Sequence, residues 1–465
     1  MTQTRDRLGS TEKWATFASG ITYEQLPNEL IPILKGLTLD TIGVALAAST
    51  LGDCCPQVAN LVRSNPGAPE CTVLGYGDRV SCLMAGFANG GLVHSLNFDA
   101  LGRAGGHIGV AAVPAPLVMA EKRGGVSGKE FLASIAAAAE FTARLAGALT
   151  AAGVDANEKF LEGQLLGFFG AAVGAGRILR CTPERMHNVL GLALMQASGT
   201  RQVSFEGGAA KAIAGAFANH GAILSVLLAE QGIDARCAAL EGPAGLYSLF
   251  YDGRYRASVV TDGLGKKFHA LDIVFKPWAT SGILHPFIEA SLQLRQQNKL
   301  DPAAIRRVQL RAGPQAKAWL EPVAERRRPR NAATAANSIF FAVAKSLLNG
   351  DVTLADFTPR GLGQPEMLAL AAAIDYVLDE QVGGGAVVEV TLRDGPVLTA
   401  TAGDRRSPVS FDQLVAKFRV CAGHAARAVS ADAVEEFIDR VANLEAEQDV
   451  GALPALLSGR AGPAC

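Results

Sequence analysis

The sequence predicts a mainly α fold made of a large all-helical domain and a smaller α+β domain. Residues 1–262 hold one apolar segment after another, and the apolar side chains recur every three or four positions, as in packed helices. Between residues 263 and 403, segments that alternate apolar and polar residues occur among the helices, as expected for strands. Residues 404–465 return to the helical pattern, and we expect them to pack on the all-helical domain.

Each element has its own local signals. Ser127 and Thr182 precede helices, Pro183 suits a first helical position, and Gly232 suits a helix end. Gly and Asp-Gly separate the alternating segments, which indicates a hairpin in 386–403. We predict helices over 27–49, 80–96, 128–149, 167–180, 182–199, 212–232, 282–297, 335–350, 365–378, 410–428 and 431–448, and strands over 303–313 and 386–403.

Composition limits the function classes. The 465 residues are 49% hydrophobic with a net charge of −1, which suits a compact soluble protein of two or more domains and not a disordered or fibrous one. The sequence has no Lys/Arg run that would favour binding to nucleic acid or to a membrane surface. The first residues lack the apolar core of a signal peptide, and Pro114, Glu140, Arg144 and Glu230 interrupt the most apolar stretches. We therefore expect a cytoplasmic protein without a membrane span.

The eight cysteines show no spacing that closes a tetrahedral zinc site. Small thiols are among the most buried side chains, so we expect reduced thiols, mostly in the core. The positions are 54, 55, 71, 82, 181, 237, 421 and 465.

The most polar loop of the first domain runs from Asn89 to His107. It brings amide, carboxylate, guanidinium and imidazole groups together where a helix ends and a glycine-rich loop begins. Asp99 and His107 are the first acid/base candidates, and Asn97 and Arg103 lie beside them in the sequence.

Four further positively chargeable positions are candidates. Lys211 opens an Ala-rich helix, where desolvation would lower its pKa; the alternative is a surface lysine whose stem covers apolar residues. Lys276 precedes Pro277 and is thereby held in an extended conformation. His285 follows in a helix, where a structural histidine is the alternative, and Lys266 could equally lie in a solvated turn.

Familiar cofactor and nucleophile motifs are absent, including the dinucleotide, P-loop, serine-hydrolase and HExxH signatures. Isolated acids and bases on loops suit proton transfer without a cofactor or metal. Pyridoxal phosphate on Lys211 or Lys276 is a weaker alternative.

Several segments together resemble the MmgE/PrpD family of 2-methylcitrate dehydratases, cis-aconitate decarboxylases and iminodisuccinate epimerases. They are LTLDTIGVALAAS, TVLGYGDRVSCLMAGFANGGLVHSLNFDA, GAAKAIAGAFANHGAILSVLLAEQGIDARCAALEGPAGLY, FKPWATSGILHPFIEA and SIFFAVAKSLLNGDVTLADFT. The resemblance runs from about residue 20 to 455. It implies that the α+β domain is a lid, that the site lies between the domains, and that the protein is a homodimer.

The resemblance also assigns site residues. Asp99, His107, Lys211 and Lys276 match positions that the family uses around its active site, and His285 matches its histidine after the lysine-proline segment. Departures are equally specific: Asn97 and Ala100 replace acids of an Asp-x-Asp-Asp run, and Phe341 replaces a tyrosine. Residues 159–163 lack the histidine of a Gly-x-His-x-Thr motif, and no histidine follows Lys211.

These losses favour a reaction with few acid/base groups. Epimerisation only removes and returns one proton, whereas dehydration also protonates a leaving hydroxyl. We therefore predict a cofactor-independent epimerase acting on a polycarboxylate such as iminodisuccinate. His107 and Lys211 or Lys276 would face opposite sides of the α-carbon, and Asp99 would orient His107. The predicted substrate-binding residues are Asn97, Arg103, Arg201, Gln202, Lys266, Ser281 and His285.

Two alternatives remain open. A hydro-lyase of the 2-methylcitrate dehydratase type, or a related decarboxylase, would use Gln164, Gln202 or Ser281 in place of the missing groups. A non-enzymatic member would bind a tricarboxylate for sensing.

Overall fold

The computed structural model describes residues 9–393, 395–403 and 409–459, and the chain divides into two units. The larger unit comprises residues 1–95, 99–275 and 409–465, and the smaller comprises 96–98 and 276–408. We predicted that the smaller domain begins at residue 263, whereas in the structure its main segment begins at residue 276. The second change of domain, expected at 404, lies in 404–408, outside the described residues. The assignment of residues 96–98 to the smaller unit was not predicted.

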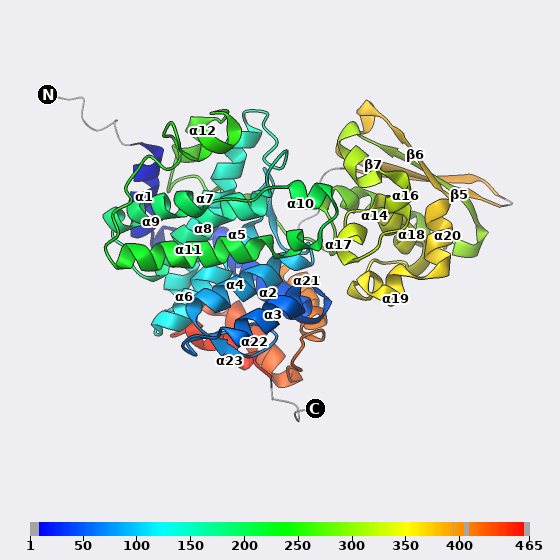
Figure 1. Ribbon diagram of the computed structural model, residues 1–465. Coiled ribbons are helices and arrows are strands. Elements are labelled where there is room, and N and C mark those ends of the chain that lie inside the picture. The colour runs from blue at the N-terminus through cyan, green and yellow to red at the C-terminus, as the bar shows by residue number, and fades with distance from the viewer. Residues whose placement is uncertain (1–8, 394, 404–408, 460–465) are drawn as a thin grey trace. The chain divides into compact units, whose positions relative to one another are not determined.

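The larger unit is built from helices (Figure 1). Its core helices are α2 (Leu30–Leu51), α4 (Cys82–Ser95), α7 (Gly128–Thr150), α8 (Glu162–Ile178) and α11 (Ala214–Glu230), and α11 packs against α4, α8 and α9. The others are α1 (Ser10–Gly20), α3 (Cys55–Ser64), α5 (Ile108–Ala112), α6 (Pro114–Arg123), α9 (Pro183–Gln196), α10 (Gln202–Phe205), α12 (Leu246–Tyr251), α13 (Ala257–Thr261), α21 (Phe411–Ala422), α22 (Ala431–Ala442) and α23 (Leu453–Leu456).

The predicted helix starts are confirmed at two positions. The Ser127 hydroxyl accepts the Glu130 amide at the start of α7, and the Thr182 hydroxyl accepts the Arg185 amide at the start of α9, both at 3.3 Å. Such bonds satisfy amides that lack a partner within the helix.

Three helices are long and apolar enough to cross a membrane: Leu30–Leu51, Gly128–Thr150 and the helical stretch Ala209–Glu230. The expectation that charged residues interrupt every such stretch is therefore wrong. In α7 the interrupting charges, Glu140 and Arg144, lie one turn apart and pair with each other at 2.5 Å. The apolar window of α7 is wholly buried inside the protein, so its apolarity serves helix packing.

The C-terminal helices return to the larger unit, where α21 packs against α2. Lys417 of α21 pairs with the buried Asp40 of α2 at 2.6 Å. Two short antiparallel strand pairs also belong to this unit: β1 (Cys71–Thr72) pairs with β2 (Arg79–Val80), and β3 (Leu101–Gly102) pairs with the distant β4 (Ile273–Val274).

The smaller unit holds a four-stranded sheet in the order β6-β5-β7-β8. The predicted strands are confirmed as β5 (Ile305–Ala312), β7 (Ala386–Leu392) and β8 (Val397–Ala402). β7 and β8 form the predicted antiparallel hairpin, although residue 394 of its turn lies outside the described residues. α14 (His285–Asn298) packs against β7 and β8.

One predicted helix of this unit is wrong in its second half. The helix expected over 365–378 ends as α20 (Pro365–Ala372), and β6 (Ile374–Leu378) follows, parallel to β5. Ile374, Tyr376 and Val377 are strand-favouring residues, and pairing with β5 decides the conformation. The remaining helices are α15 (Lys317–Leu320), α16 (Val323–Arg327), α17 (Ala332–Ala335), α18 (Ile339–Asn349) and α19 (Pro359–Leu362).

The described cysteines carry free thiols, as expected. Five are buried, Cys54 is half-buried and Cys237 is exposed. Cys465 lies outside the described residues.

Candidate active site

A reversal of the chain places Asp99 beside His107. The Gly109 amide donates to the Ala100 carbonyl and the Gly102 amide to the Gly106 carbonyl, so residues 100–102 run back along 106–109. Gly105 and Gly106 have φ values of 108° and 87°, which disfavour any residue with a side chain. The two glycines thus form the turn from which His107 leads into α5.

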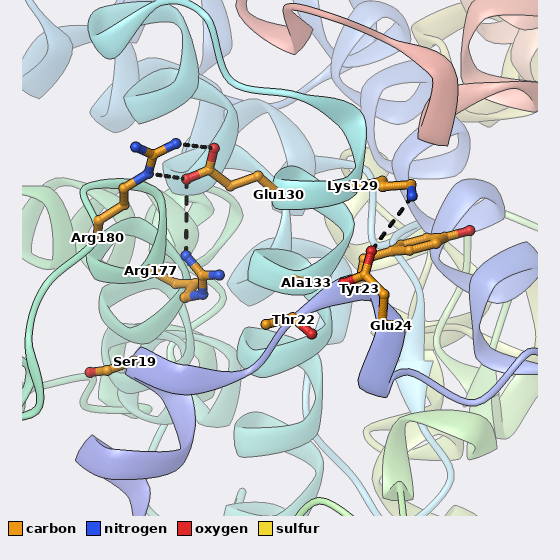
Figure 2. A pocket seen from close by; sticks show the side chains of 9 residues that line it. All are labelled: Ser19, Thr22, Tyr23, Glu24, Lys129, Glu130, Ala133, Arg177 and Arg180. Atoms are coloured by element: carbon orange, nitrogen blue, oxygen red, sulfur yellow. Dashed lines mark hydrogen bonds and ion pairs between the residues drawn. The ribbon is translucent and has the colours of Figure 1, made fainter.

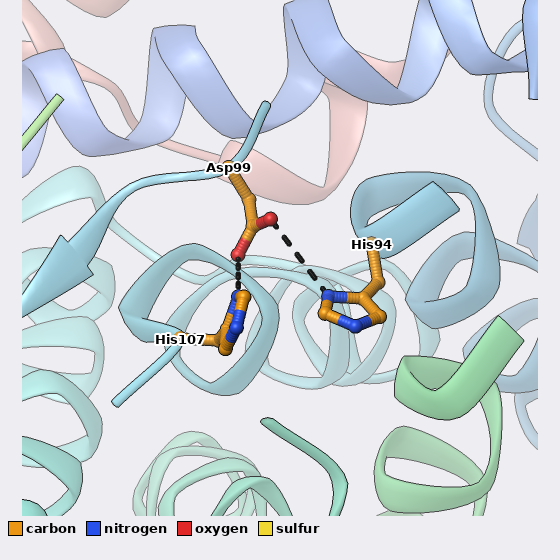
Figure 3. Close-up of side chains that lie close together, drawn as sticks. All are labelled: His94, Asp99 and His107. Atoms are coloured by element: carbon orange, nitrogen blue, oxygen red, sulfur yellow. Dashed lines mark hydrogen bonds and ion pairs between the residues drawn. The ribbon is translucent and has the colours of Figure 1, made fainter. Parts of the chain in front are cut away.

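Asp99 and His107, the predicted acid/base candidates, lie side by side and form a hydrogen bond (Figure 3). His107 Nδ1 lies 2.7 Å from Asp99 Oδ2, and the Asp99 side chain is fully buried. The carboxylate fixes the ring orientation and occupies Nδ1. Nε2 is therefore the ring nitrogen left to take or deliver a proton.

A second histidine, His94, shares this carboxylate and was not singled out from the sequence. Its Nδ1 lies 3.8 Å from Asp99 Oδ1, and its ring meets that of His107 edge to face at 4.6 Å (Figure 3). Burial lowers the pKa of His94 to about 4, with His107 and Lys211 adding to the effect against Asp99. His94 is thus neutral near pH 7. Its place five positions before Asp99, at the end of α4, was the available signal.

Lys211 belongs to the same neighbourhood. It lies on η2 (Ala209–Ile213), a 3-10 turn that precedes α11 and packs against α4. Its ammonium is close enough to His94 to help lower the pKa of that ring. The expected helix opening is therefore a tighter turn, and the lysine adds positive charge beside the histidines.

Glu162, the first residue of α8, supplies a second buried carboxyl close to His107. Asn157 Nδ2 donates to its Oε2 at 2.8 Å, and its Oε1 lies against Gly105. Burial raises the pKa of Glu162, whereas the charge of His107 opposes that rise. The sequence signal was an acid opening an otherwise apolar helix.

The next residue, Gly163, forms the floor under the His107 ring. A Cβ atom at this position would lie 3.0 Å from His107 Cγ and Cδ2. Glycine therefore permits the close contact that holds the imidazole between α8 and Asp99.

His94, Asp99 and His107 also offer three potential metal-ligand atoms within 4.8 Å of one another. Two imidazoles and a carboxylate are a common ligand set for divalent transition metals. In the present arrangement, the 2.7 Å contact between Asp99 and His107 is a direct hydrogen bond, with a proton between the two atoms. The geometry thus describes an acid/base pair, and the absence of a metal stays a prediction.

The smaller unit holds the other predicted group. Lys276 is 1% exposed, and its Nζ donates to the Asn97 carbonyl at 2.7 Å and to Asn97 Oδ1 at 2.9 Å. Asn97 has a φ of 52°, a conformation that asparagine tolerates. The predicted residues Lys276 and Asn97 are therefore a bonded pair.

Two more predicted residues lie in the smaller unit. His285 is buried at the start of α14, and its ring meets Trp278 edge to face at 5.4 Å. The Ser281 amide donates to the Ala336 carbonyl at 2.8 Å, just before the 3-10 turn η4 (Gly282–Leu284). The substrate-binding roles of Ser281 and His285 stay predictions.

Four predicted substrate-binding residues make their hydrogen bonds and ion pairs elsewhere than with His94, Asp99 or His107, within the described part of the chain. Arg103 pairs loosely with Asp272 at 3.9 Å, and Lys266 is exposed. Gln202 donates to Glu206, and Arg201 donates to the Asn157 carbonyl. Their residue types suit an anionic substrate, and the sequence alone could not show these partners. Their role in substrate binding stays a prediction.

The fold defines a two-domain, mainly α protein that carries a hydrogen-bonded aspartate–histidine pair in its larger unit. The MmgE/PrpD N-terminal domain model matches residues 12–257, and the MmgE/PrpD C-terminal domain model matches residues 278–445. The chain therefore belongs to the MmgE/PrpD family, which confirms the resemblance inferred from its sequence.

Similar proteins cover nearly the whole chain. The chain is 25% identical to a cis-aconitate decarboxylase of Aspergillus terreus (strain NIH 2624 / FGSC A1156), over 97% of this chain and 96% of that protein. It is 26% identical to cis-aconitate decarboxylase of Homo sapiens, over 97% and 95%. These names favour the lyase alternative, and the epimerase branch stays a prediction.

Proposed function

We propose that this protein is a lyase that removes a carboxyl group from a tricarboxylate of the cis-aconitate kind. The observation that carries the proposal is the buried Asp99–His107 pair in a chain that aligns end to end with cis-aconitate decarboxylases. The lyase alternative thereby takes precedence over the predicted epimerase.

Decarboxylation makes two demands on a site. Breaking the bond between carbon and carboxylate releases carbon dioxide and leaves an electron pair, which delocalises into an adjoining unsaturated carboxylate. Nearby cations stabilise that charge, and an acid then protonates the carbon. His107 Nε2 is the proposed proton donor, oriented by Asp99. Lys211 supplies positive charge beside it, and Lys276 is a second proposed cation.

Proton NMR in deuterated water tests the proposal. Incubation with cis-aconitate should give carbon dioxide and an unsaturated dicarboxylate with one carbon fewer, carrying deuterium at the newly protonated carbon. An unchanged tricarboxylate after prolonged incubation with folded protein would reject decarboxylation.

Epimerisation of iminodisuccinate is the second candidate, and a specific observation favours it. Phe341, buried in α18 with its ring 5.5 Å from that of Phe357, offers no phenol, and residues 159–163 contain no histidine. The same NMR experiment with iminodisuccinate stereoisomers distinguishes the two. Loss of the α-proton signal with interconversion of stereoisomers, and no carbon dioxide from cis-aconitate, would replace the lyase by the epimerase.

A further inference from the structure

An arginine-lined cavity of about 440 Å³ opens in the larger unit beside the turn that follows α1 (Figure 2). Its size falls within the range of about 300–1,000 Å³ that is usual for small-molecule pockets. Its charged lining consists of Lys129, Arg177, Arg180, Glu24 and Glu130. None of these residues belongs to the Asp99–His107 site, so the cavity calls for its own explanation.

The carboxylate of Glu130 is already shared by two arginines. Arg180 donates to its two oxygens at 2.8 and 3.2 Å, and Arg123 donates to them at 2.7 and 3.3 Å. Paired, fork-like bonds of this type satisfy a carboxylate well. Glu130 therefore has little capacity to neutralise another cation.

Arg177 is that additional cation. Its Nε and Nη2 donate to the Ile21 carbonyl at 3.1 and 2.9 Å, and its Nη1 lies 4.0 Å from Glu130, beyond hydrogen-bond distance. Within the described residues, Nη1 forms no hydrogen bond. Burial lowers the pKa of Arg177. The charge of Glu130 opposes this effect, and the like charges of Arg180 and Arg123 add to it.

The opposite side of the cavity continues the positive lining. Lys129 Nζ lies 3.5 Å from Glu24 Oε1 and 5.1 Å from the centre of the Tyr23 ring. Figure 2 shows Lys129 beside Glu24 and Tyr23. With Arg123 behind Glu130, four cations face two carboxylates. The Ser19 and Thr22 side chains add hydroxyl groups to the lining.

We propose that this cavity binds a small multivalent oxyanion, with Arg177 and Lys129 as its principal contacts. The shared ligand chemistry is that of inorganic phosphate and of a free di- or tricarboxylate. An oxyanion would accept from Arg177 Nη1 and supply the missing negative charge. The proposal is independent of the reaction catalysed at Asp99 and His107.

Isothermal titration of the full-length protein with phosphate, and separately with citrate, tests the proposal. Saturable binding of one anion or both is expected, and the two arms identify the source. Arg177→Gln and Lys129→Gln should each weaken this binding by about tenfold or more, since each removes a charge-assisted contact. Lys129 is half exposed and has no backbone hydrogen bond to lose, so its variant tests the site even if Arg177→Gln disturbs the Ile21 turn.

Arg236→Gln is the matched control, because Arg236 is exposed and, within the described residues, its one ion pair is with the nearby Asp234. It should bind like the wild type. Absence of saturable binding by either anion at concentrations up to about 10 mM, roughly the weak end of specific affinities, would overturn the proposal. Equal binding by the wild type and the Lys129→Gln variant would overturn it as well.

Discussion

The carboxylate of Asp99 lies between two imidazole rings, and its two oxygens face different partners. One oxygen holds His107 Nδ1, which leaves Nε2 for proton transfer, and the other faces His94 Nδ1. The two histidines thereby differ in role although their rings touch. His94 is kept neutral by burial, whereas His107 is partly exposed and oriented for chemistry.

His94 should make the protein less stable in acid. Its pKa falls from 6.5 to about 4 on folding, so between these values the unfolded chain binds more protons than the folded one. Stability is therefore lost as pH falls from about 6.5 towards 4, with a loss on the order of 2 kcal/mol between pH 7 and pH 5. His94→Gln should remove this contribution in urea unfolding measured at both pH values. The control His424→Gln should keep it, and an unchanged pH dependence in His94→Gln would disprove the assignment.

Glu162 should act in the opposite direction. Because burial raises its pKa, the folded state favours the neutral acid, and stability falls as pH rises from about 4.5 through the folded pKa. The Glu162→Gln variant lacks this loss, so its free energy of unfolding should increase relative to that of the wild type as pH rises. Unfolding curves between pH 4.5 and 8 measure the difference. The control Glu158→Gln changes an exposed residue nearby and should show the same pH dependence as the wild type. If Glu162→Gln also shows the wild-type pH dependence, Glu162 does not titrate as we infer.

At the scale of elements, the start of α8 determines where His107 lies. Gly163 lets the helix approach the imidazole, and Glu162 lies against Gly105 in the turn that precedes it. Sequence periodicity predicted α8, but its first residues had no apolar repeat to mark them. The contact of Gly163 with His107 joins positions far apart in the chain, so only the folded structure reveals it.

Gly163→Ala should therefore impair turnover without unfolding the protein. The added methyl group would meet the His107 ring at 3.0 Å and displace it from Asp99. Misplacement of a catalytic group by about 1 Å commonly lowers rates by up to 100-fold, so we expect a loss of about 10- to 100-fold in kcat. In Gly167→Ala, on the same helix, the new methyl meets only the Ala218 methyl at 3.3 Å, and activity should be largely retained. Equal kcat values for the two variants would contradict this role of Gly163.

For the whole molecule, local patterns predicted most elements but not all long-range pairings. Helices α2, α4, α7, α8, α9 and α11, the β7–β8 hairpin and the closeness of Asp99 to His107 followed from periodicity, turn residues and the polar loop. Helices α3, α5, α6 and α10 were not predicted. β6 was taken for the end of a helix because its pairing with β5 joins distant segments. Arg103, Arg201, Gln202 and Lys266 were chosen for charge or polarity, and composition does not specify which partners their side chains find in the fold.

The predicted homodimer belongs to the same scale and stays a prediction. Sedimentation equilibrium at micromolar concentration should give twice the chain mass of 48.3 kDa. A single species with the mass of one chain at every concentration would refute it.

The most direct test of the central claim compares turnover of cis-aconitate by the wild type, Asp99→Asn and the matched surface variant Asp272→Asn. Asp99→Asn removes the carboxylate that orients His107, so we predict that carbon dioxide release and deuterium incorporation slow by about 100-fold or more. Asp272→Asn should match the wild type, because Asp272 is exposed and pairs only loosely with Arg103. Turnover by a folded Asp99→Asn protein at the wild-type rate would contradict the account.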